Sequence, residues 1–492
     1  AGISGFAAAK YLAAAGARVT LSDAKDEADA EKDAVTQQHI EALRAQGISC
    51  VFGAQREELL DGTDLIVLSP AVPERIPLVC AARERGIRVT TEVELAGEIA
   101  SAPIYAITGT NGKTTTSYLV RAILRHAGRR VGLIGTIQAM IEDEVLPTAN
   151  TTPDIIVLQQ MLAEMRTRGM DTVVMEVSSH ALALGRVAGI EFDTAVFTNL
   201  TQDHLDFHKT MENYARAKAH LFELVSAPGA KEGKTAVLNA DDAASETMRA
   251  YTRCPIITYG VDHPADLTAQ DVQLACDGME LTLMHGGKRL FHLHTGITGL
   301  FNVHNVLAAV GASLAEHVAA ADIAAALTAF TGVPGRFELV REGQDFAVIV
   351  DYAHTPDGME NVLRTARAVT KGRIIAVFGC GGDRDRTKRP IMGRIGAEMA
   401  DIAILTSDNP RTEDPAAIVD EVERGVLPVI GDKPYEKIVD RRTAIFHAIG
   451  RAQAGDTVVI LGKGHETYQI LKDGTIHFDD REQAREAIRS RA

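Results

Sequence analysis

Short apolar runs alternate with amphipathic stretches along the whole 492-residue chain. A strand buried on both faces has a near-continuous apolar sequence, whereas a helix packed on a sheet is apolar on one face only. Alternation of the two patterns predicts α/β domains built on parallel sheets. The runs predicted to be buried strands are residues 64–70, 172–177, 346–352, 373–379, 402–408 and 457–462.

Segment 151–169 has the pattern of a capped helix. Its apolar residues recur at the spacing of one helical face, and they are Ile155, Leu158, Leu162 and Met165. We expect Thr152 to cap the N-terminus and Pro153 to lie in the first turn, where a missing N–H costs little.

The chain is too long for one hydrophobic core, so several domains are expected. Two segments rich in Gly, Pro and small residues have the composition of linkers. The predicted domains are Rossmann-like (1–98), a central P-loop mononucleotide-binding domain with a parallel sheet (99–334), and Rossmann-like again (335–492). The first domain opens with a turn and a helix, and its first strand is expected before Ala1, so we expect the natural protein to be slightly longer.

Charge and cysteine usage narrow the function. The formal net charge of −15 argues against a nucleic-acid partner, which usually meets a basic surface. Five scattered cysteines without a C-x-x-C pair fit a reducing compartment better than disulfides or a zinc site. No apolar run reaches the roughly 18 residues needed to cross a bilayer. We expect a cytoplasmic monomer that neither spans a membrane nor binds nucleic acid.

The stretch AITGTNGKTTT, residues 106–116, has the pattern of a phosphate-binding loop with unusual spacing. Its Gly-Lys-Thr end matches a Walker A motif, but Ile107 stands where the first glycine belongs. A strand precedes the loop and a helix follows, so free N–H groups and the helix dipole favour an anion. Lys113 adds positive charge, and Thr114 or Thr115 offers a hydroxyl to magnesium. The loop predicts a nucleoside triphosphate site, with a plain glycine turn as the alternative.

Three further polar features follow this loop. Glu176 ends an otherwise apolar strand, and a buried carboxylate is costly unless it is paired or binds a metal. Lys218 lies among small and apolar residues on a predicted helix. One loop between them holds two acids and two histidines, which are Asp203, His204, Asp206 and His208. Any one of these could be an ordinary solvated side chain, but together with a phosphate loop they favour a catalytic site.

Motifs in a fixed order give the chain a resemblance to the Mur ligase family. They are GTNGKTTT, NTTPD, MEVSSHAL, TNLTQDHLDFH, YARAKAHLF, GLFNVHNVLAA, VPGRFE, DYAHTPDG, GCGGDRDRTKRP, SDNPRTEDP and GKGHE, over about residues 100–470. The resemblance implies an ATP-dependent amide ligase that builds the peptide stem of bacterial peptidoglycan. The γ-phosphate of ATP would convert a carboxylate into an acyl phosphate, and an amine would then attack to give amide, ADP and phosphate.

The resemblance also implies roles for single residues. The implied catalytic residues are Lys113, Glu176, His204 and Lys218. Lys218 would react with CO2 to form a carbamate, an anion that can bind magnesium as a protonated lysine cannot. The ligands implied for two magnesium sites are Thr114, Glu176, His204 and carbamylated Lys218. The implied ATP contacts are Gly109, Thr110, Asn111, Gly112, Lys113, Thr114, Thr115, Asn302, Arg336 and Asp351.

Several predicted strands of the third domain end in polar residues, and the carboxyl ends of parallel strands form one crevice. The sequence DNPR at 408–411 resembles the signature of the type E Mur ligases, which add meso-diaminopimelate. Arg411 could bind the distal carboxylate of this diamine through two parallel bonds, and Glu466 could bind its ammonium. Lysine lacks that carboxylate, and losing two bonds of about 1.5–3 kcal/mol each means roughly a hundredfold or more in discrimination. The implied contacts are Arg384, Asp408, Asn409, Pro410, Arg411, Gly462 and Glu466.

The resemblance implies UDP-N-acetylmuramoyl-L-alanyl-D-glutamate as the acceptor. Its contacts in the central domain are implied to be Asn150, Thr151, Thr152, Ser178 and Arg186. The family often has glutamine two residues before this arginine, where this chain has Leu184. The first domain instead resembles the type D Mur ligases, which add D-glutamate. The residues implied to hold UDP there are Ser4, Asp23 and Ser69.

Three alternatives stay open from the sequence: a D-glutamate ligase, a folylpolyglutamate synthase, and a nucleotide-binding regulator without catalysis. A folylpolyglutamate synthase should lack DNPR together with GKGHE. The four implied catalytic residues argue against a regulator. Because the added amino acid is chosen in the C-terminal half, the type E features outweigh the type D features of the first domain.

Overall fold

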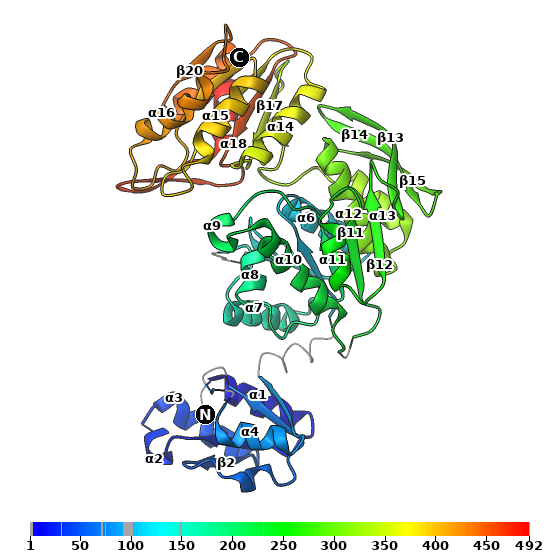
Figure 1. Ribbon diagram of the computed structural model, residues 1–492, viewed down its shortest axis with the longest axis vertical. Coiled ribbons are helices and arrows are strands. Elements are labelled where there is room, and N and C mark those ends of the chain that lie inside the picture. Colours follow the sequence, from blue (N-terminus) through cyan, green and yellow to red (C-terminus); the bar gives the residue numbers. More distant parts are fainter. Residues whose placement is uncertain are drawn as a thin grey trace.

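The computed structural model describes residues 3–30, 32–69, 72–73, 75–91, 102–146, 150–229 and 231–491. Three groups of sheets follow one another along the chain, coloured from blue through green to red in Figure 1. The first predicted domain boundary, at 98/99, lies outside the described residues. The second, at 334/335, lies between the last strand of the central sheet and the first of the C-terminal sheet.

Two small parallel sheets form the first group, in which β1 pairs with β2 and β3 with β4. Leu21, Leu43 and Ile48 are its buried core. Of strand β3, which was predicted to be buried, only Leu68 is fully buried, because β3 belongs to a two-stranded sheet with little cover. The elements are α1 Ile3–Ala14, β1 Thr20–Asp23, α2 Glu27–Ala30, α3 Ala34–Ala45, β2 Ser49–Phe52, a 3-10 helix Glu57–Leu60, β3 Leu65–Leu68, α4 Pro77–Glu84 and β4 Arg88–Thr91.

Eleven strands form the central sheet, in the order β15-β14-β13-β12-β11-β10-β5-β9-β6-β7-β8. The strands from β13 to β6 in this order are parallel, and antiparallel hairpins extend both edges. The strands are β5 Ile104–Thr108, β6 Val131–Ile134, β7 Ala139–Ile141, β8 Glu144–Leu146, β9 Thr172–Glu176, β10 Thr194–Phe197, β11 Thr235–Asn239, β12 Ile256–Gly260, β13 Leu267–Ala275, β14 Gly278–His285 and β15 Lys288–Thr295.

Helices cover both faces of this sheet, because successive side chains of a strand point to opposite faces. On β5, Tyr105 and Ile107 pack with α6 and α12, whereas Ile104 and Ala106 pack with α7 and α10. The helices are α6 Lys113–His126, α7 Ile155–Thr167, α8 Ser179–Ala183, α9 Leu205–His208, α10 Met211–Ser226, α11 Ser245–Tyr251, α12 Leu300–Ala315 and α13 Ala320–Thr328.

Helix α7 has the predicted apolar face but not the predicted cap. Asp154 is the N-cap, so Pro153 precedes the helix and does not lie in its first turn. The hydroxyl of Thr152 donates instead to the Glu176 carbonyl at 2.9 Å, at the end of β9. The expected capping role of Thr152 was wrong because a bond to a neighbouring strand replaces it.

Six strands form the C-terminal sheet, in the order β16-β17-β21-β18-β19-β20. All except β16 are parallel, so their carboxyl ends lie at one edge. Helices α14, α15 and α16 pack on one face, and α17 and α18 on the other. The elements of this part of the chain are β16 Glu338–Leu339, β17 Ala347–Asp351, α14 Pro356–Val369, β18 Ile374–Phe378, α15 Lys388–Met399, β19 Ile402–Leu405, α16 Pro415–Val426, β20 Tyr435–Lys437, α17 Arg441–Arg451, β21 Thr457–Leu461, β22 Tyr468–Leu471, β23 Gly474–His477 and α18 Asp480–Arg491. Strands β22 and β23 form a separate antiparallel pair.

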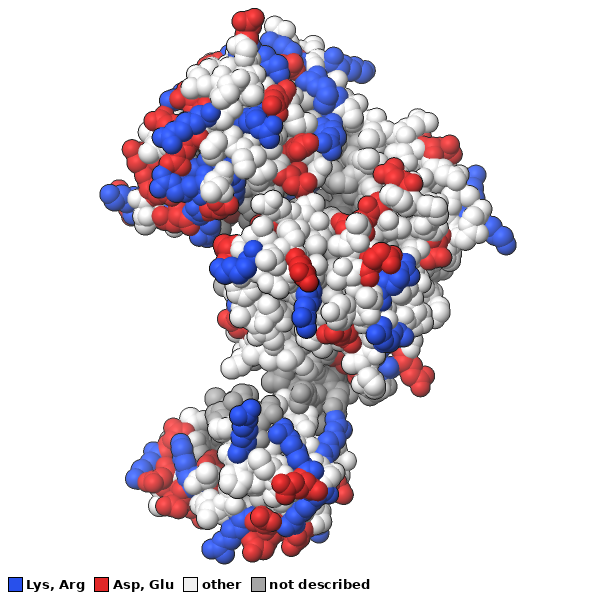
Figure 2. All heavy atoms as spheres, in the orientation of Figure 1, with Lys and Arg blue, Asp and Glu red and all other residues white. Residues whose placement is uncertain are grey.

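The distribution of charged side chains on the surface is relevant to the binding partners expected from the sequence. On the face drawn in Figure 2, acidic and basic side chains are intermingled, so neither sign dominates that face. No helix within the described ranges is long and apolar enough to cross a membrane. All five cysteines are free thiols.

Candidate active site

Two positions in the phosphate loop between β5 and α6 can be occupied only by glycine. Gly109 has a φ of 153° and Gly112 a φ of 83°. A Cβ atom on Gly109 would collide with the hydroxyl of Thr198, and one on Gly112 with the amide oxygen of Asn305. Close backbone approach at both ends is typical of loops that present N–H groups to phosphate.

Two side chains that follow β10 hold the tip of this loop. The Thr198 hydroxyl donates to the Asn111 carbonyl at 2.6 Å, and the Asn199 side-chain oxygen accepts from the Asn111 N–H at 2.8 Å. These bonds fix the conformation of a loop that is shorter than a Walker A loop. Sequence reasoning did not assign Thr198, Asn199 or Asn305, although each lies within a motif that the sequence displays.

Lys113 begins α6, and Glu176 faces the first turn of this helix from the end of β9. The Lys113 ammonium donates to the carbonyls of Gly109 and Thr110, both at 2.9 Å, and its burial lowers its pKa. The Glu176 carboxylate, fully buried at the end of β9, accepts from the Thr114 hydroxyl at 3.1 Å. It also accepts from the N–H and hydroxyl of Thr136, at 2.9 and 2.8 Å. Thr136 was not predicted, because no motif marks it.

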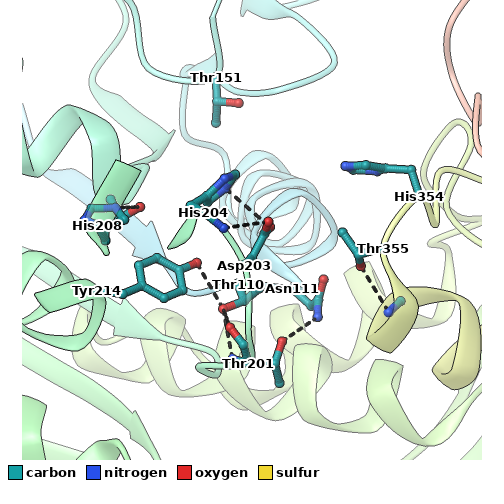
Figure 3. Close-up of polar contacts among 12 residues, drawn as sticks. Thr110, Asn111, Thr151, Thr201, Asp203, His204, His208, Tyr214, His354 and Thr355 are labelled. Atoms are coloured by element: carbon teal, nitrogen blue, oxygen red, sulfur yellow. Dashed lines mark hydrogen bonds and ion pairs between the residues drawn. The ribbon is translucent and has the colours of Figure 1, made fainter. Parts of the chain in front are cut away.

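Lys218 on α10 is buried and reaches the same loop. Its ammonium donates to the Gly109 carbonyl at 2.7 Å and lies 4.5 Å from the centre of the Tyr214 ring. Burial lowers the pKa of Lys218 well below its ordinary value, and the nearby charge of Lys113 adds to this effect. The Tyr214 hydroxyl in turn lies 3.1 Å from the Thr110 hydroxyl (Figure 3). A buried, weakly basic amine is therefore held beside the phosphate loop.

The two histidines predicted in the next loop have different surroundings. His204 has a left-handed φ of 53°, and its ring lies 3.4 Å from the Asp203 carboxylate (Figure 3). His208 is buried in the short helix α9, and its Nε2 lies 2.9 Å from the Ser179 hydroxyl. Burial and the neighbouring rings of His180 and His204 lower the pKa of His208 to about 4. Asp206 and His208 thus belong to a helix and not to the loop that we predicted.

Residues of the C-terminal domain meet the phosphate loop. Arg336 stacks on the Tyr352 ring at 4.5 Å and donates to the Thr114 hydroxyl at 3.4 Å. The Asn111 amide donates to Asp357, at the start of α14, at 2.7 Å. In Figure 3, His354 of the same domain points toward the space between His204 and Thr151. The predicted nucleotide contacts Arg336 and Asp351 lie on this side, and Asp351 accepts from the N–H groups of Phe337 and Ala353.

The donors around Thr114 suit magnesium and a triphosphate. Magnesium prefers oxygen ligands and usually keeps several positions for phosphate and water. Thr114 and Glu176 supply such oxygens, and within the described residues no group of three His, Cys, Asp or Glu could hold a metal alone. The buried Nε of Arg336 has no hydrogen-bond partner among the described residues, and an anionic group would satisfy it.

The predicted adenine contact, Asn302, is buried on α12. Its amide nitrogen donates to the Thr298 carbonyl at 2.8 Å, and its oxygen accepts from Asn305 at 2.9 Å. Asn305 therefore links Asn302 to the phosphate loop, because it also contacts Gly112 and the Thr116 hydroxyl. Residues three apart share a helical face, and this spacing could have revealed Asn305 from the sequence.

The predicted amino-acid residues converge at the carboxyl edge of the C-terminal sheet. The Asn409 amide donates to Glu466 at 2.9 Å, and Lys463 donates to Glu466 at 3.0 Å and to Asn409 at 3.1 Å. Asp408 lies beside Gly462, where a Cβ atom would collide with its carboxylate. Lys463 is fully buried and is the one member of this cluster to which the sequence analysis gave no role.

Arg411 has a φ of 53° and donates from its guanidinium to the Gly382 carbonyl at 2.9 Å and to the Asn409 carbonyl at 3.4 Å. Gly381 lies between Arg411 and Arg384: its Cβ would lie 2.9 Å from an Arg411 nitrogen and 3.9 Å from Arg384 Cγ. Pro410 supplies the carbonyl that leaves no room for a side chain at Gly382. The Arg411 guanidinium and the aliphatic part of the Arg384 side chain thus both lie near Gly381.

The predicted acceptor residues of the central domain also lie together. The hydroxyls of Thr151 and Thr136 are 3.0 Å apart, and Ser178 caps α8. Arg186 pairs with Asp154 at 2.9 Å and donates to the Thr152 carbonyl at 3.2 Å. Leu184 is exposed to 55% and Asn150 is exposed, so neither is part of the packed core.

The residues predicted to hold UDP belong to the first group of sheets. Asp23 ends β1 and accepts from the Lys25 N–H at 3.0 Å. Ser69 directly follows β3. Ser4 lies in α1, and its side chain is outside the described part of the structure.

Three family models match the chain. They describe the Mur ligase MurD-like N-terminal domain over residues 1–91, the Mur ligase middle domain over 107–313 and the Mur ligase glutamate ligase domain over 335–464. A UDP-N-acetylmuramoyl-L-alanyl-D-glutamate–2,6-diaminopimelate ligase of Bacillus cereus is 51% identical over 389 residues, 79% of this chain and 78% of the relative. The ligase of that name from Bacillus licheniformis is 46% identical over 435 residues, 88% of both proteins.

Solved structures of Mur ligases are similar to this chain in fold. A structure of a ligase of the same name is 33% identical, covers 87% of this chain and 92% of its own, and has a TM-score of 0.60. The UDP-N-acetylmuramate-alanine ligase of Thermotoga maritima, at 19% identity, covers 99% of this chain and 96% of its own with a TM-score of 0.56, a likeness of fold alone. The predicted α/β architecture of three domains is confirmed.

Proposed function

Because the chain belongs to the Mur ligase family, we propose that it joins meso-diaminopimelate to UDP-N-acetylmuramoyl-L-alanyl-D-glutamate in peptidoglycan precursor synthesis, with ATP as the energy source. Relatives about half identical over most of the chain are named for this reaction. A structural neighbour at 33% identity carries the same name. The reaction class is that of an ATP-dependent acid–amino-acid ligase.

The observation that supports the choice of amino acid is that Arg411 and Glu466 both contact Asn409. Asn409 donates from its amide to Glu466 at 2.9 Å and accepts at its carbonyl from Arg411 at 3.4 Å. A guanidinium and a carboxylate that are both bonded to Asn409 lie close enough to bind a ligand with a carboxylate and an ammonium on the same carbon. The distal end of meso-diaminopimelate has these two groups. Lys463 also binds Glu466, so the incoming ammonium would share this carboxylate.

The chemistry of activation would take place at the phosphate loop. Lys113 and the loop N–H groups would bind the ATP phosphates, and Arg336 would add charge from the C-terminal domain. The acceptor carboxylate would attack the γ-phosphate, ADP would leave, and the amine would then displace phosphate. The residues that would hold magnesium are Thr114, Glu176, His204 and Lys218 as a carbamate. Magnesium would supply neutralisation of the charge on the transferring phosphoryl group.

The weak basicity of Lys218 supports the carbamate, because only a neutral amine can add to CO2. Its burial and its neighbour Lys113 both disfavour the protonated form. We also propose that the enzyme works as a monomer in the cytoplasm, which five free thiols suit.

A panel of amino acids, assayed with ATP and UDP-N-acetylmuramoyl-dipeptide by phosphate release, tests the proposal. We expect turnover with meso-diaminopimelate to exceed that with L-lysine by about a hundredfold or more. Addition of D-glutamate to UDP-N-acetylmuramoyl-L-alanine is the second candidate, because the first 91 residues match the MurD-like model. The panel is therefore repeated with UDP-N-acetylmuramoyl-L-alanine as the acceptor, and a preference for D-glutamate with this acceptor would replace the proposed function with this one.

A further inference from the structure

Beneath the proposed amino-acid site lies a buried arginine for which the sequence motifs gave no role. Arg389, in the first turn of α15, has no exposed surface. Its guanidinium donates to the two carboxylate oxygens of Glu413 at 2.9 and 2.8 Å and to Glu421 at 2.8 Å. It also donates to the Gly381 carbonyl at 3.1 Å. Burial of a charged group is costly unless it is well paired, and the two carboxylates supply this pairing. The buried Nε of Arg389 has no hydrogen-bond partner among the described residues.

Two of the three partners of Arg389, Gly381 and Glu413, belong to the two loops that carry the proposed specificity residues, and the third, Glu421, lies in α16. The first loop follows β18 and contains Gly381 and Asp383. The second follows β19 and contains Arg411 and Glu413. Glu413 binds Arg389 and also accepts from the Asp383 N–H at 2.6 Å. Arg389 and Glu413 therefore fasten one loop to the other.

The loops also pack directly on each other. The Gly382 N–H donates to the Asn409 carbonyl at 2.9 Å, and a Cβ atom on Gly382 would collide with the Pro410 carbonyl. The Thr412 hydroxyl donates to Asp383 at 2.7 Å. With no space between the loops, a shift of one moves the other.

Arg411 depends on this arrangement for its direction. Its backbone has the left-handed φ of 53°, which a non-glycine residue keeps only where the surroundings hold it. Its N–H donates to the Ile470 carbonyl at 3.1 Å, and its guanidinium to the Gly382 carbonyl at 2.9 Å. The second of these bonds ends on the loop that Arg389 holds.

We propose that Arg389 is a positioning residue for amino-acid selectivity, which acts through Glu413 and the Gly381 loop to aim Arg411. The inference rests on the proposed function, since it assumes that Arg411 binds the distal carboxylate of the diamine. Arg389 itself would touch no substrate. Its effect must therefore disappear once the Arg411 side chain has been removed.

The test is the ratio of kcat/KM for meso-diaminopimelate to kcat/KM for L-lysine, measured in Arg389→Lys. Lysine keeps the charge but cannot bind Glu413 with two parallel bonds and also reach Gly381. We expect the ratio to fall about tenfold or more, with KM for the diamine raised and KM for ATP within about twofold of the original. The ratio does not depend on the fraction of folded enzyme, so a purely structural loss cannot imitate this result.

Arg373→Lys is the matched control. Arg373 binds Asp456 through two nitrogens, at 3.1 and 2.6 Å, in the same domain but at the opposite ends of the strands. We expect its selectivity ratio to stay within about twofold of the original. Glu413→Gln, which keeps the size of the side chain, should lower the ratio in the same direction as Arg389→Lys and serves if that variant does not fold.

A double variant decides whether the effect passes through Arg411. Arg389→Lys combined with Arg411→Ala should have the selectivity ratio of Arg411→Ala alone, because coupled residues are not additive. Independent, multiplying losses would overturn the proposal, as would an unchanged ratio in both Arg389→Lys and Glu413→Gln. The panel on the original enzyme comes first, so a failure of the proposed function is seen there and is separate from either result.

Discussion

The side-chain amide of Asn111 lies 2.7 Å from the carboxylate of Asp357, although 246 residues separate them. Asn111 is at the tip of the phosphate loop, and Asp357 is in the first turn of α14 in the C-terminal domain. The Thr201 hydroxyl donates to the same oxygen of Asp357 at 3.2 Å. One carboxylate thus ties the domain that would bind the amino acid to the loop that would bind ATP.

Asp357→Ala should therefore impair amide formation more than ATP binding. Hydrogen bonds to a charged group contribute about 1.5–3 kcal/mol, so we expect kcat/KM for the amino acid to fall roughly tenfold to a hundredfold. Binding of a non-hydrolysable ATP analogue, followed by calorimetry, should change by less than about threefold. Glu360→Ala on the same helix is the control, because within the described ranges Glu360 forms an ion pair only with the exposed Arg364. Equal activity of the two variants would contradict a role for the Asn111–Asp357 contact.

Lys218→Met should abolish turnover and stabilise the protein. The buried lysine has a pKa well below that of the unfolded chain, because burial and Lys113 disfavour its charge. At neutral pH the unfolded chain therefore binds a proton that the folded chain binds less well, which lowers the free energy of unfolding. This penalty shrinks as pH rises toward the ordinary lysine pKa.

We expect the melting temperature of Lys218→Met to exceed that of the original protein by a few degrees at pH 7, since about 1 kcal/mol moves it by 2–4 °C. The difference should be smaller at pH 10. Buffers free of CO2 keep the carbamate from forming during the measurement. For the function, Lys218→Ala should regain part of its activity with a short carboxylic acid in solution, and full activity without that acid would exclude the carbamate.

Arg411→Ala should lose the preference for meso-diaminopimelate and keep ATP binding. The guanidinium lies in the C-terminal domain, where it donates to the Gly382 and Asn409 carbonyls, away from the phosphate loop. We expect the kcat/KM ratio of meso-diaminopimelate to L-lysine to fall about a hundredfold, the value of two lost bonds to a charged group. Arg384→Ala gives a useful comparison, because among the described residues the Arg384 guanidinium donates only to the carbonyl of its neighbour Asp383 and should affect the ratio less. Unchanged selectivity in Arg411→Ala would remove Arg411 from the site.

The sequence predicted those features that are encoded locally. The β5–loop–α6 unit, the buried strands of the central and C-terminal sheets and the apolar face of α7 follow from short patterns of a few residues. Ile107 replaces the first glycine of a Walker A loop, and Thr198 and Asn199, which follow β10, hold the shortened loop at Asn111. No local sequence pattern displays these contacts. The capping role expected of Thr152 was wrong for the same reason, since its hydroxyl bonds to the end of β9.

Buried ion pairs are the clearest example of features that could not be predicted from the sequence. The chain has 51 basic and 66 acidic residues, and nothing in their order distinguishes Arg389 and Glu413 from exposed pairs. Their role depends on which loops meet after β18 and β19, and that follows from the strand order of the sheet. Lys463 is a similar case, because its burial against Asn409 and Glu466 requires the position of two strands.

The linker between the central and C-terminal domains supplies the last prediction. Gly335 has a φ of 66°, and a Cβ atom there would collide with the backbone of Gly464 and His465. Gly335 thus packs directly on the loop that bears Glu466, and the next residue, Arg336, reaches Thr114 of the phosphate loop.

The added Cβ of Gly335→Ala should push the linker away from the loop that bears Glu466, so that this loop and the Arg336–Thr114 contact no longer keep their relative positions. Because a misplacement of about 1 Å can cost a hundredfold in rate, we expect kcat/KM for the amino acid to fall by roughly that factor. Gly343→Ala is the matched control, since Gly343 also has a left-handed φ, of 90°, but has no atom within 4 Å of the added Cβ. Both variants carry the backbone cost of about 1–2 kcal/mol, visible as a lower melting temperature, but only Gly335→Ala should lose activity. A Gly335→Ala enzyme as active as Gly343→Ala would show that amide formation does not require close contact between the linker and the amino-acid loop.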